Sequence, residues 1–174
     1  MINIIYGNLF DSKANFIVHQ VNCQGVMGSG VARQVADKYP HVETEYRKYL
    51  NRCDKNHIGA LGTAQYVPTD VWALPLVDTM KNNNVTAYDL DYQYIVNMFG
   101  QDTFGDGLRT DLKAMKRAFA DIREKAQSIG ATVAMPYRIG SCRGGANWED
   151  VYTIIEKTFG NSDVDVEIWR YDLD

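Results

Sequence analysis

The chain has 174 residues, of which 45% are hydrophobic and 23% charged, and its formal net charge is −4. This length and composition are typical of a single globular domain, and no apolar run reaches the roughly 18 residues that a membrane-spanning helix needs. A negative net charge also argues against a surface that follows a nucleic-acid backbone. We therefore expect neither a membrane nor a nucleic-acid partner.

The N-terminal segment and the cysteines indicate a cytoplasmic protein. Residues 1–6 contain no basic stretch followed by a long apolar core, as a signal peptide would. Cys23, Cys53 and Cys142 are odd in number and widely spaced, which fits neither a disulfide framework nor a zinc site. We expect one domain over residues 1–174 that is monomeric, with reduced thiols, no metal and no cofactor.

Apolar periodicity in the first half of the chain predicts short strands and two helices. Strands are expected where β-branched and aromatic residues cluster, and helices where apolar residues recur every three or four positions. The first helix should end before Pro40, whose nitrogen cannot join the backbone ladder. Residues 78–90 contain consecutive asparagines and no periodicity, which indicates an exposed loop. The expected strands span residues 2–6, 16–21, 63–67 and 71–76, and the expected helices residues 31–39 and 41–51.

The second half begins with an almost continuous apolar run over residues 92–99, which is typical of a central strand covered on both faces. Amphipathic spacing then predicts a helix over residues 109–128, and Gly130 ends it. Alternating strands and helices of this kind predict an α/β sandwich. The remaining expected elements are strands over residues 132–135 and 164–169 and a helix over residues 147–159.

Residues 18–33 combine a strand, a glycine-rich loop and a helix start. Glycine lets a phosphate approach the backbone closely because it has no side chain. The helix that opens after Gly30 would point free N–H groups, and the positive end of its dipole, at such a phosphate. The stretch therefore predicts an anion-binding loop, although a plain strand-to-helix connection has the same pattern.

Residues 136–148 repeat this arrangement of strand, glycine-rich turn and helix. If both strands are parallel, the two loops converge on one crevice at the carboxyl edge of the sheet, where α/β proteins usually bind ligands. Two helix N-termini that face one crevice suggest a diphosphate ligand. The loops carry neither the Gly-Lys-Ser/Thr of a P-loop nor the spacing and acidic residue of a Rossmann fingerprint.

The order and spacing of these motifs resemble those of the macrodomains, a family that binds ADP-ribose. The resemblance rests on Gly7-Asn8-Leu9-Phe10 and on residues 19–40, 97–101 and 136–159. It is strongest for the small stand-alone branch that contains fungal ADP-ribose-1″-phosphate phosphatases and the glycohydrolases that remove terminal ADP-ribose from glutamate. It implies a three-layer α/β/α fold with a central mixed, mostly parallel sheet of about six strands.

The resemblance also implies how ADP-ribose would be held. The Gly-Asp-Leu/Ile turn with which macrodomains recognise adenine has Asn8 here, so the acceptor loses its charge. Trp169 matches an aromatic residue that stacks on adenine, with Tyr171 as the fallback, although a half-buried edge residue would have the same pattern. The first loop would surround the distal ribose and the diphosphate, and the backbone amides of the second loop would bind the diphosphate. Arg143 either adds charge there or is a solvated loop arginine. The implied ligand-binding residues are Asn8, Leu9, Gln20, Asn22, Gly28, Ser29, Gly30, Val31, Ile139, Gly140, Ser141, Cys142, Arg143, Gly144, Gly145, Ala146 and Trp169.

The chain departs from the glycohydrolase pattern at the positions that carry that chemistry. The glycohydrolase branch uses a lysine just after the central strand and an aspartate in the second loop. This chain has Asn97 or Met98 at the first position and Gly144 at the second. None of these residues can form a Schiff base or act as a general base.

The phosphatase branch offers other candidate catalytic residues. His19 matches a histidine of that branch, and a free imidazole titrates near neutral pH. The alternative is a core histidine inside an apolar strand. Asp102 and Asp106 follow the central strand and could supply an acid or a base, although a solvated turn is the simpler interpretation, above all for Asp106. The candidate catalytic residues are His19, Asp102 and Asn22.

The resemblance leaves more than one function open. The first is an enzyme that hydrolyses a substituent from the distal ribose of ADP-ribose, for which we expect ADP-ribose-1″-phosphate. The second is a module that binds free ADP-ribose or ADP-ribosylated macromolecules without turnover; ADP-ribosyl glycohydrolase and O-acetyl-ADP-ribose deacetylase are further alternatives. The stand-alone domain and His19 favour the enzyme, whereas the missing lysine and aspartate favour the binding module. An RNA-binding macrodomain is disfavoured by the negative charge.

Overall fold

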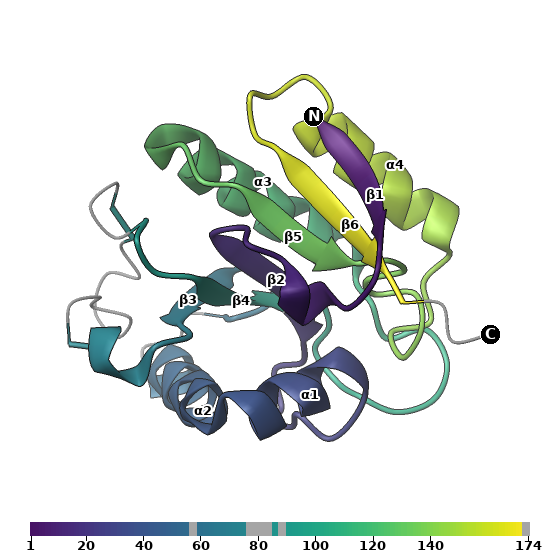
Figure 1. The fold of residues 1–174 in the computed structure, drawn as a ribbon. Helices are drawn as coiled ribbons and strands as arrows, with labels where there is room; N and C mark the ends of the chain where they lie inside the picture. Colours follow the sequence, from purple (N-terminus) through teal and green to yellow (C-terminus); the bar gives the residue numbers. More distant parts are fainter. Residues whose placement is uncertain (56–58, 76–84, 87–89, 172–174) are drawn as a thin grey trace.

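A six-stranded mixed sheet forms the centre of the molecule (Figure 1). The computed structural model describes residues 1–55, 59–75, 85–86 and 90–171. The strand order is β1-β6-β5-β2-β4-β3; β3 pairs antiparallel with β4, and the other neighbouring strands are parallel. The strands are β1 (Ile2–Tyr6), β2 (Phe16–Val21), β3 (Ala64–Pro68), β4 (Tyr94–Phe99), β5 (Val133–Pro136) and β6 (Val166–Arg170).

Helices cover both faces of the sheet and give the three-layer α/β/α arrangement that the resemblance implies. In Figure 1, α1 and α2 lie on one side of the sheet, and α3 and α4 lie on the other. The helices are α1 (Gly30–Lys38), α2 (Pro40–Lys55), α3 (Leu112–Ile129) and α4 (Trp148–Phe159), with short 3-10 helices η1 (Leu9–Asp11) and η2 (Val71–Ala73). Within the part of the chain that is described, no helix has the length and apolar character needed to cross a membrane.

The core is built around β2 and β4 at the centre of the sheet. Phe16, Ile17 and Val18 of β2 are buried, and so is every residue of β4. Because side chains alternate between the two faces of a strand, Phe16 and Val18 pack with residues of α3 and α4, and Ile17 packs with residues of α1 and α2. The nearly continuous apolar run over β4 therefore reflects a strand covered on both sides, as predicted.

The strand predicted over residues 71–76 is wrong. Val71–Ala73 form the 3-10 helix η2. The side chain of Asp70 accepts a hydrogen bond from the Trp72 N–H at 2.9 Å, a local contact that favours a turn over a strand. Residue 76 and most of the loop predicted over residues 78–90 lie outside the described residues.

The other predicted helices and strands are present with small changes at their ends. The helix predicted over residues 41–51 extends to Lys55, and the helix predicted to start at residue 109 begins only at Leu112, after its cap residue Asp111. The N–H groups of Arg109 and Thr110 donate instead to the Gly144 carbonyl, at 2.8 and 2.9 Å. The segment before α3 is therefore attached to the second glycine-rich loop.

Candidate functional site

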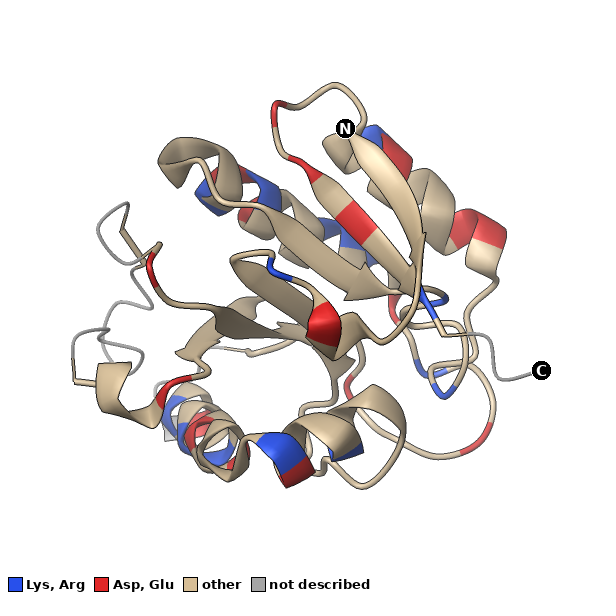
Figure 2. Cartoon of the chain, viewed as in Figure 1, with Lys and Arg blue, Asp and Glu red and all other residues tan. Residues whose placement is uncertain are grey.

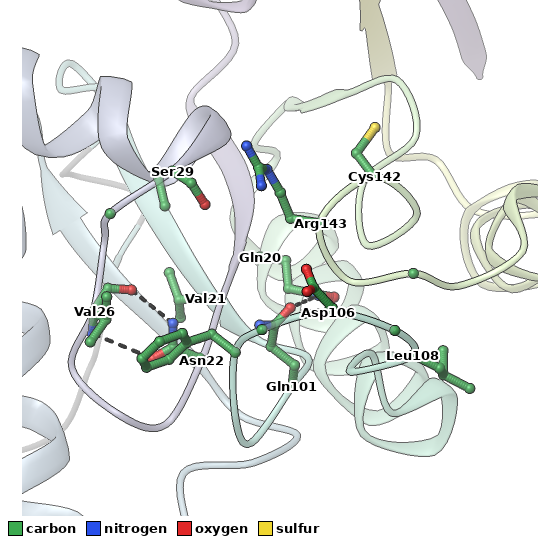
Figure 3. A pocket seen from close by; sticks show the side chains of 16 residues that line it. Gln20, Val21, Asn22, Val26, Ser29, Gln101, Asp106, Leu108, Cys142 and Arg143 are labelled. Atoms are coloured by element: carbon green, nitrogen blue, oxygen red, sulfur yellow. Dashed lines mark hydrogen bonds between the residues drawn. The ribbon is translucent and has the colours of Figure 1, made fainter.

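The glycine-rich loops after β2 and β5 lie together at one edge of the sheet. β2 and β5 are parallel neighbours, so their carboxyl ends and the loops that follow them meet. Three pockets run along these loops: the Trp169 pocket of about 580 Å³, the central pocket of about 250 Å³ and the Asp106 pocket of about 640 Å³, which Figure 3 shows. Cys142 lines all three, so the pockets adjoin one another, and we call them together the cleft. The Trp169 pocket is lined by Asn8, Leu9, Val31 and Trp169, the central pocket by Gln20, Gly30, Val31 and Gly140, and the Asp106 pocket by Asn22, Ser29, Asp106 and Arg143.

The first loop leaves the N-terminus of α1 free to bind an anion. Ser29 precedes the helix, yet its hydroxyl makes no capping hydrogen bond to the first turn. The N–H groups of Gly30, Val31 and Ala32 have no acceptor among the described residues. Gly30 has a φ of +59°, a left-handed conformation that glycine adopts without strain. These donors and the helix dipole favour a negatively charged group in the central pocket, as the sequence predicts.

The side chain of Asn22 stabilises the conformation of the first loop through hydrogen bonds within the loop. Its Nδ2 donates to the Val26 carbonyl at 2.7 Å, and its Oδ1 accepts from the Gln24 N–H and from the Tyr46 hydroxyl, each at 2.9 Å. Asn22 lines the Asp106 pocket, but the loop uses most of its hydrogen-bonding capacity. Its direct contact with a ligand or a reacting atom stays a prediction.

The expected second free helix N-terminus is wrong. The side chain of Asn147 caps α4 by accepting hydrogen bonds from the N–H groups of Glu149 and Asp150. Because Asn147 satisfies these donors, the N-terminus of α4 does not present them to an anion.

The second loop instead presents N–H groups from its own backbone. Two of its amides are used internally, because the Ser141 N–H donates to the Arg138 carbonyl and the Ala146 N–H donates to the Gly140 carbonyl. The N–H groups of residues 142–145 have no acceptor within the described ranges. Four consecutive residues of the loop, rather than all of the predicted residues 141–146, therefore remain available as donors to an anion.

Asn8 and Trp169 meet in the Trp169 pocket, as the resemblance implies. The indole Nε1 donates to the Glu167 carboxylate at 2.7 Å, and a Cβ at Gly7 would lie 3.2 Å from the indole ring. Asn8 Oδ1 accepts from the Phe10 N–H at 3.0 Å, and a carbonyl oxygen can accept a second hydrogen bond. The pocket thus has an aromatic wall and an acceptor, which suit a heteroaromatic base; the stacking of such a base on Trp169 stays a prediction.

Asp106 lines the pocket at the other end of the cleft, and Asp102 does not. The backbone carbonyl of Asp102 accepts from the Cys23 N–H at 2.9 Å, and its carboxylate accepts from Gln24 Nε2 at 3.5 Å. Asp102 thereby ties the segment after β4 to the first loop. Arg143 also lines the Asp106 pocket, and Figure 3 shows its side chain extending toward the first loop. This pocket therefore combines a carboxylate with a guanidinium.

His19 is buried in the sheet and is also among the residues that line the central pocket. Its side chain is 1% exposed, and its Nε2 lies 2.7 Å from Asn97 Oδ1. Asn97 Nδ2 donates to Gln65 Oε1 at 3.0 Å, so Asn97 Oδ1 accepts and His19 Nε2 donates. The three residues are cross-strand neighbours on β2, β4 and β3, and we call them the polar row. These contacts favour the core interpretation of His19 over the catalytic one.

Burial also sets the charge of His19. Loss of solvation lowers the pKa of the imidazole from 6.5 to about 4, and the hydrogen bond to Asn97 offsets only part of that effect. His19 is therefore neutral at pH 7, with Nδ1 as its unprotonated nitrogen, and Nδ1 has no hydrogen-bond partner among the described residues. A ring that is neutral well below pH 7 and bonded inside the sheet is poorly suited to general acid catalysis.

The partly buried thiol of Cys23 is not activated for chemistry. Cys23 follows β2, and burial raises the pKa of its thiol to about 12, so it is not a thiolate at neutral pH. Cys23, Cys53 and Cys142 are all free. Across the ranges that the structure covers, no group of at least three His, Cys, Asp or Glu side chains could hold a metal ion.

Arg138 and Gln101 line the cleft but are absent from the predicted site. Arg138 lines both the Trp169 and the central pockets, and its φ of +59° is unusual for a residue with a side chain. Gln101 lines the Asp106 and central pockets immediately after β4. Both residues lie within segments on which the resemblance rests, and that position is the signal that could have identified them.

Comparison with known proteins assigns the family. Residues 18–155 match the Macro domain family. The chain belongs to the macrodomain family. Its relatives include the ADP-ribose 1″-phosphate phosphatase of Meyerozyma guilliermondii, which is 24% identical over 175 residues that cover 90% of this chain and 93% of the relative. The protein of the same name from Saccharomyces cerevisiae is 36% identical over 73 residues, or 40% of each chain. A DNA ADP-ribosyl glycohydrolase from Mycobacterium tuberculosis is 40% identical over 52 residues, but the match covers only 30% of this chain and 15% of that protein.

Solved structures share the macrodomain fold over nearly the whole chain. The macrodomain of Mycobacterium tuberculosis DarG has a TM-score of 0.71 at 24% identity and covers 97% of both chains. A macrodomain protein from Streptomyces coelicolor has a TM-score of 0.74 at 22% identity, covering 99% of this chain and 100% of that one. Thermosipho africanus DarTG in complex with ADP-ribose has a TM-score of 0.70 at 19% identity, covering 97% of this macrodomain and 41% of that chain.

Lowering the pH should destabilise the protein through His19. Between pH 6.5 and about 4 the unfolded chain takes up a proton at His19 while the folded protein does not, so the free energy of unfolding falls as the pH falls. The full effect, reached below about pH 4, is about 3 kcal/mol, and most of it is present at about pH 4.5. Urea titrations at about pH 7 and about pH 4.5 measure it. His19→Gln, which cannot take up this proton, should lose less stability over the same interval; equal losses in both proteins would contradict the prediction.

Gly28→Glu should abolish ligand binding without unfolding the macrodomain. A Cβ at Gly28 would meet only Val26 Cγ1, at an ordinary 3.5 Å, so the backbone tolerates a side chain there. Gly28 lines the Asp106 pocket, however, and a carboxylate would repel an anion in the cleft. Calorimetric titration with ADP-ribose and melting temperatures measure the two effects, with Gly28→Ala as the uncharged control. Retained affinity in folded Gly28→Glu would show that this loop is only a connection.

Proposed function

We propose that this macrodomain binds ADP-ribose along the cleft and hydrolyses ADP-ribose-1″-phosphate to ADP-ribose and inorganic phosphate. The observation that carries the binding mode is the adjacency of the three pockets along the two loops, which carry backbone N–H groups that are unpaired among the described residues. ADP-ribose has a matching order of parts: an aromatic base, two linked phosphates and a distal ribose. A single ligand of this shape would fill the cleft from one end to the other.

In the proposed complex each part of the ligand meets groups of suitable chemistry. Adenine lies against Trp169 and within reach of Asn8. The diphosphate accepts hydrogen bonds from the first turn of α1 and from the N–H groups of residues 142–145. The distal ribose enters the Asp106 pocket, beside Arg143. Backbone donors of this kind bind an anion without requiring a strongly basic protein, in keeping with the net charge of −4.

The phosphatase activity is supported by the long matches to phosphatases and by the Asp106 pocket. Proteins from Meyerozyma guilliermondii and Lodderomyces elongisporus that carry this name match 90% of the chain, at 24% and 25% identity. A phosphate on the distal ribose would lie near Arg143, whose charge would stabilise it. Water attacks phosphorus, the P–O bond to the 1″ oxygen breaks, and a proton returns to that oxygen. Asp106 is the side chain that we propose moves protons in this step.

A glycohydrolase mechanism with an acidic residue in the second loop has less support. A Cβ at Gly144 would overlap the Thr110 hydroxyl and would lie 2.5 Å from the Gly140 carbonyl oxygen. The loop therefore has no room for the aspartate that the glycohydrolase branch carries at the position of Gly144. The match to the DNA ADP-ribosyl glycohydrolase covers too little of either chain to outweigh this steric argument.

ADP-ribose should bind with a micromolar dissociation constant, and AMP and ribose 5-phosphate should bind at least about tenfold more weakly because each fills only part of the cleft. Isothermal titration calorimetry measures the three affinities. In a parallel assay with ADP-ribose-1″-phosphate, O-acetyl-ADP-ribose and glutamate-linked ADP-ribosylated protein, turnover should occur with the first substrate. Binding without turnover of any of the three would identify a non-catalytic module, and the absence of binding heat for ADP-ribose would overturn the proposal entirely.

Asp106→Asn should lower turnover of ADP-ribose-1″-phosphate by at least about tenfold, because an amide cannot exchange a proton in its place. The dissociation constant for ADP-ribose should change by less than about threefold, since the amide keeps the size of the carboxyl group. Asp102→Asn is the matched control, because Asp102 lies on the same loop but outside the pocket. Steady-state phosphate release measures both variants. An equal loss in both, or a loss in Asp102→Asn alone, would exclude Asp106 from the proton transfer.

A further inference from the structure

A cluster of polar side chains lies beneath the second loop and joins it to the segment after β4. Gln20 Nε2 donates two hydrogen bonds, to Gln101 Oε1 at 2.7 Å and to Thr110 Oγ1 at 2.8 Å. Thr110 Oγ1 in turn donates to the Gly140 carbonyl at 2.7 Å. We call Gln20, Gln101 and Thr110 the support cluster. Each donor in it has a defined acceptor, so the direction of the hydrogen bonds is fixed from the sheet to the loop.

Backbone hydrogen bonds reinforce the same attachment at a second point of the loop. The N–H groups of Arg109 and Thr110 both donate to the Gly144 carbonyl, at 2.8 and 2.9 Å. The carbonyl and the N–H of a trans peptide point in opposite directions. With the Gly144 carbonyl held toward Thr110, the N–H of Gly145 points away from the cluster. Gly145 lines the Asp106 pocket, so the attachment leaves this donor for a ligand.

The second loop packs against the support cluster without space for a side chain. A Cβ at Gly144 would overlap Thr110 Oγ1 and lie 2.8 Å from Gln20 Nε2. A Cβ at Gly140 would lie 2.5 Å from Met115 Cε, 3.0 Å from Gln20 Oε1 and 3.3 Å from Thr110 Oγ1, and the φ of Gly140 is +73°. Gly144 is therefore required by the close approach of the cluster, and Gly140 by its positive φ together with the approach of Met115 and the cluster, so the loop packs directly on the side chains below it.

The amide of Gln20 indicates that the support cluster fixes the position of the second loop at some cost to the stability of the fold. Its Oε1 is buried and has no hydrogen-bond partner among the described residues, because the two donations from Nε2 fix the orientation of the amide. A buried acceptor without a partner lowers the stability of the fold. The orientation of the Gln20 amide that leaves Oε1 unpaired is the one that lets Nε2 donate to Gln101 and to Thr110, which in turn donates to the loop.

We infer that Thr110 is a positioning residue for the phosphate-binding loop. Thr110 is 5% exposed and lines none of the three pockets, so it acts through Gly140 and Gly144 and not by touching the ligand. Its hydroxyl receives one hydrogen bond from the sheet and passes one to the loop, which aligns the N–H groups of residues 142–145. This inference rests on the proposed binding of ADP-ribose for its functional consequence, but the effect on the loop does not depend on a ligand.

The test compares Thr110→Val, which removes the hydroxyl and keeps the shape, with Thr110→Ser, which keeps the hydroxyl. In hydrogen–deuterium exchange of the ligand-free proteins, Thr110→Val should speed exchange in peptides that cover residues 138–147 and leave those covering residues 26–34 unchanged. Its dissociation constant for ADP-ribose should rise about tenfold, as expected when donors to a diphosphate are misaligned. Thr110→Ser should stay within about twofold of the wild type in both measurements.

The outcomes separate the inference from the proposed function. If Thr110 contributes only to stability, the melting temperature of Thr110→Val falls while exchange in residues 138–147 and ADP-ribose affinity stay as in the wild type, which overturns the inference. If the wild type binds no ADP-ribose, the proposed function fails, and the exchange data still decide whether Thr110 positions the loop. Should Thr110→Val not fold, Thr110→Cys replaces it, because a thiol is only a weak hydrogen-bond donor. If residues 138–147 of Thr110→Cys then exchange no faster than in the wild-type and Thr110→Ser proteins, the inference is contradicted.

Discussion

The cleft depends on backbone N–H groups that the protein leaves without internal acceptors. Unpaired donors are tolerated at the mouth of a cleft, where water or a ligand can accept from them, whereas burial would make them costly. The macrodomain keeps them available by holding both loops through other atoms. Asn22 and Tyr46 hold the first loop, and Thr110 holds the carbonyl side of the second. Because both loops follow neighbouring parallel strands, β2 and β5, their donors face the same cleft.

Charge is distributed along the cleft rather than concentrated in one basic patch. Arg138 lines the central and Trp169 pockets, Arg143 lines the central and Asp106 pockets, and Asp106 adds a carboxylate at the far end. Figure 2 shows acidic and basic residues mixed over the rest of the molecule. In the proposed complex, neutral peptide dipoles would therefore carry much of the anion recognition, and the arginines would add charge along the path of the ligand. This division suits an acidic protein with a net charge of −4.

The sequence was sufficient for the fold and for the two loops, because both leave local patterns. Apolar runs and glycine-rich turns before helices are properties of neighbouring residues, and they located β2, β4, β5 and the cleft. Contacts between distant segments left no such pattern. The burial of His19 beside Asn97 and the position of Asp106 at the pocket depend on how strands and loops pack. The capping of α4 by Asn147 is a local contact instead, and an asparagine directly before a helix is a recognisable cap. The incorrect strand at residues 71–76 has a local cause, since Asp70 competes for the backbone N–H that a strand would use elsewhere.

The polar row of His19, Asn97 and Gln65 has a consequence for how the sheet assembles. These residues face one another only when β2, β4 and β3 pair in the native alignment. If any of the strands slid by one position, an imidazole or a carboxamide would be pressed against aliphatic neighbours with no hydrogen bond to make. The row therefore discriminates against mispaired sheets while the chain is folding, when a uniformly apolar centre would accept several alignments almost equally well. It also makes substitution at these positions interdependent. Replacing Asn97 would leave both His19 and Gln65 without their partner in the row, whereas replacing all three with aliphatic residues would remove the requirement together with the discrimination.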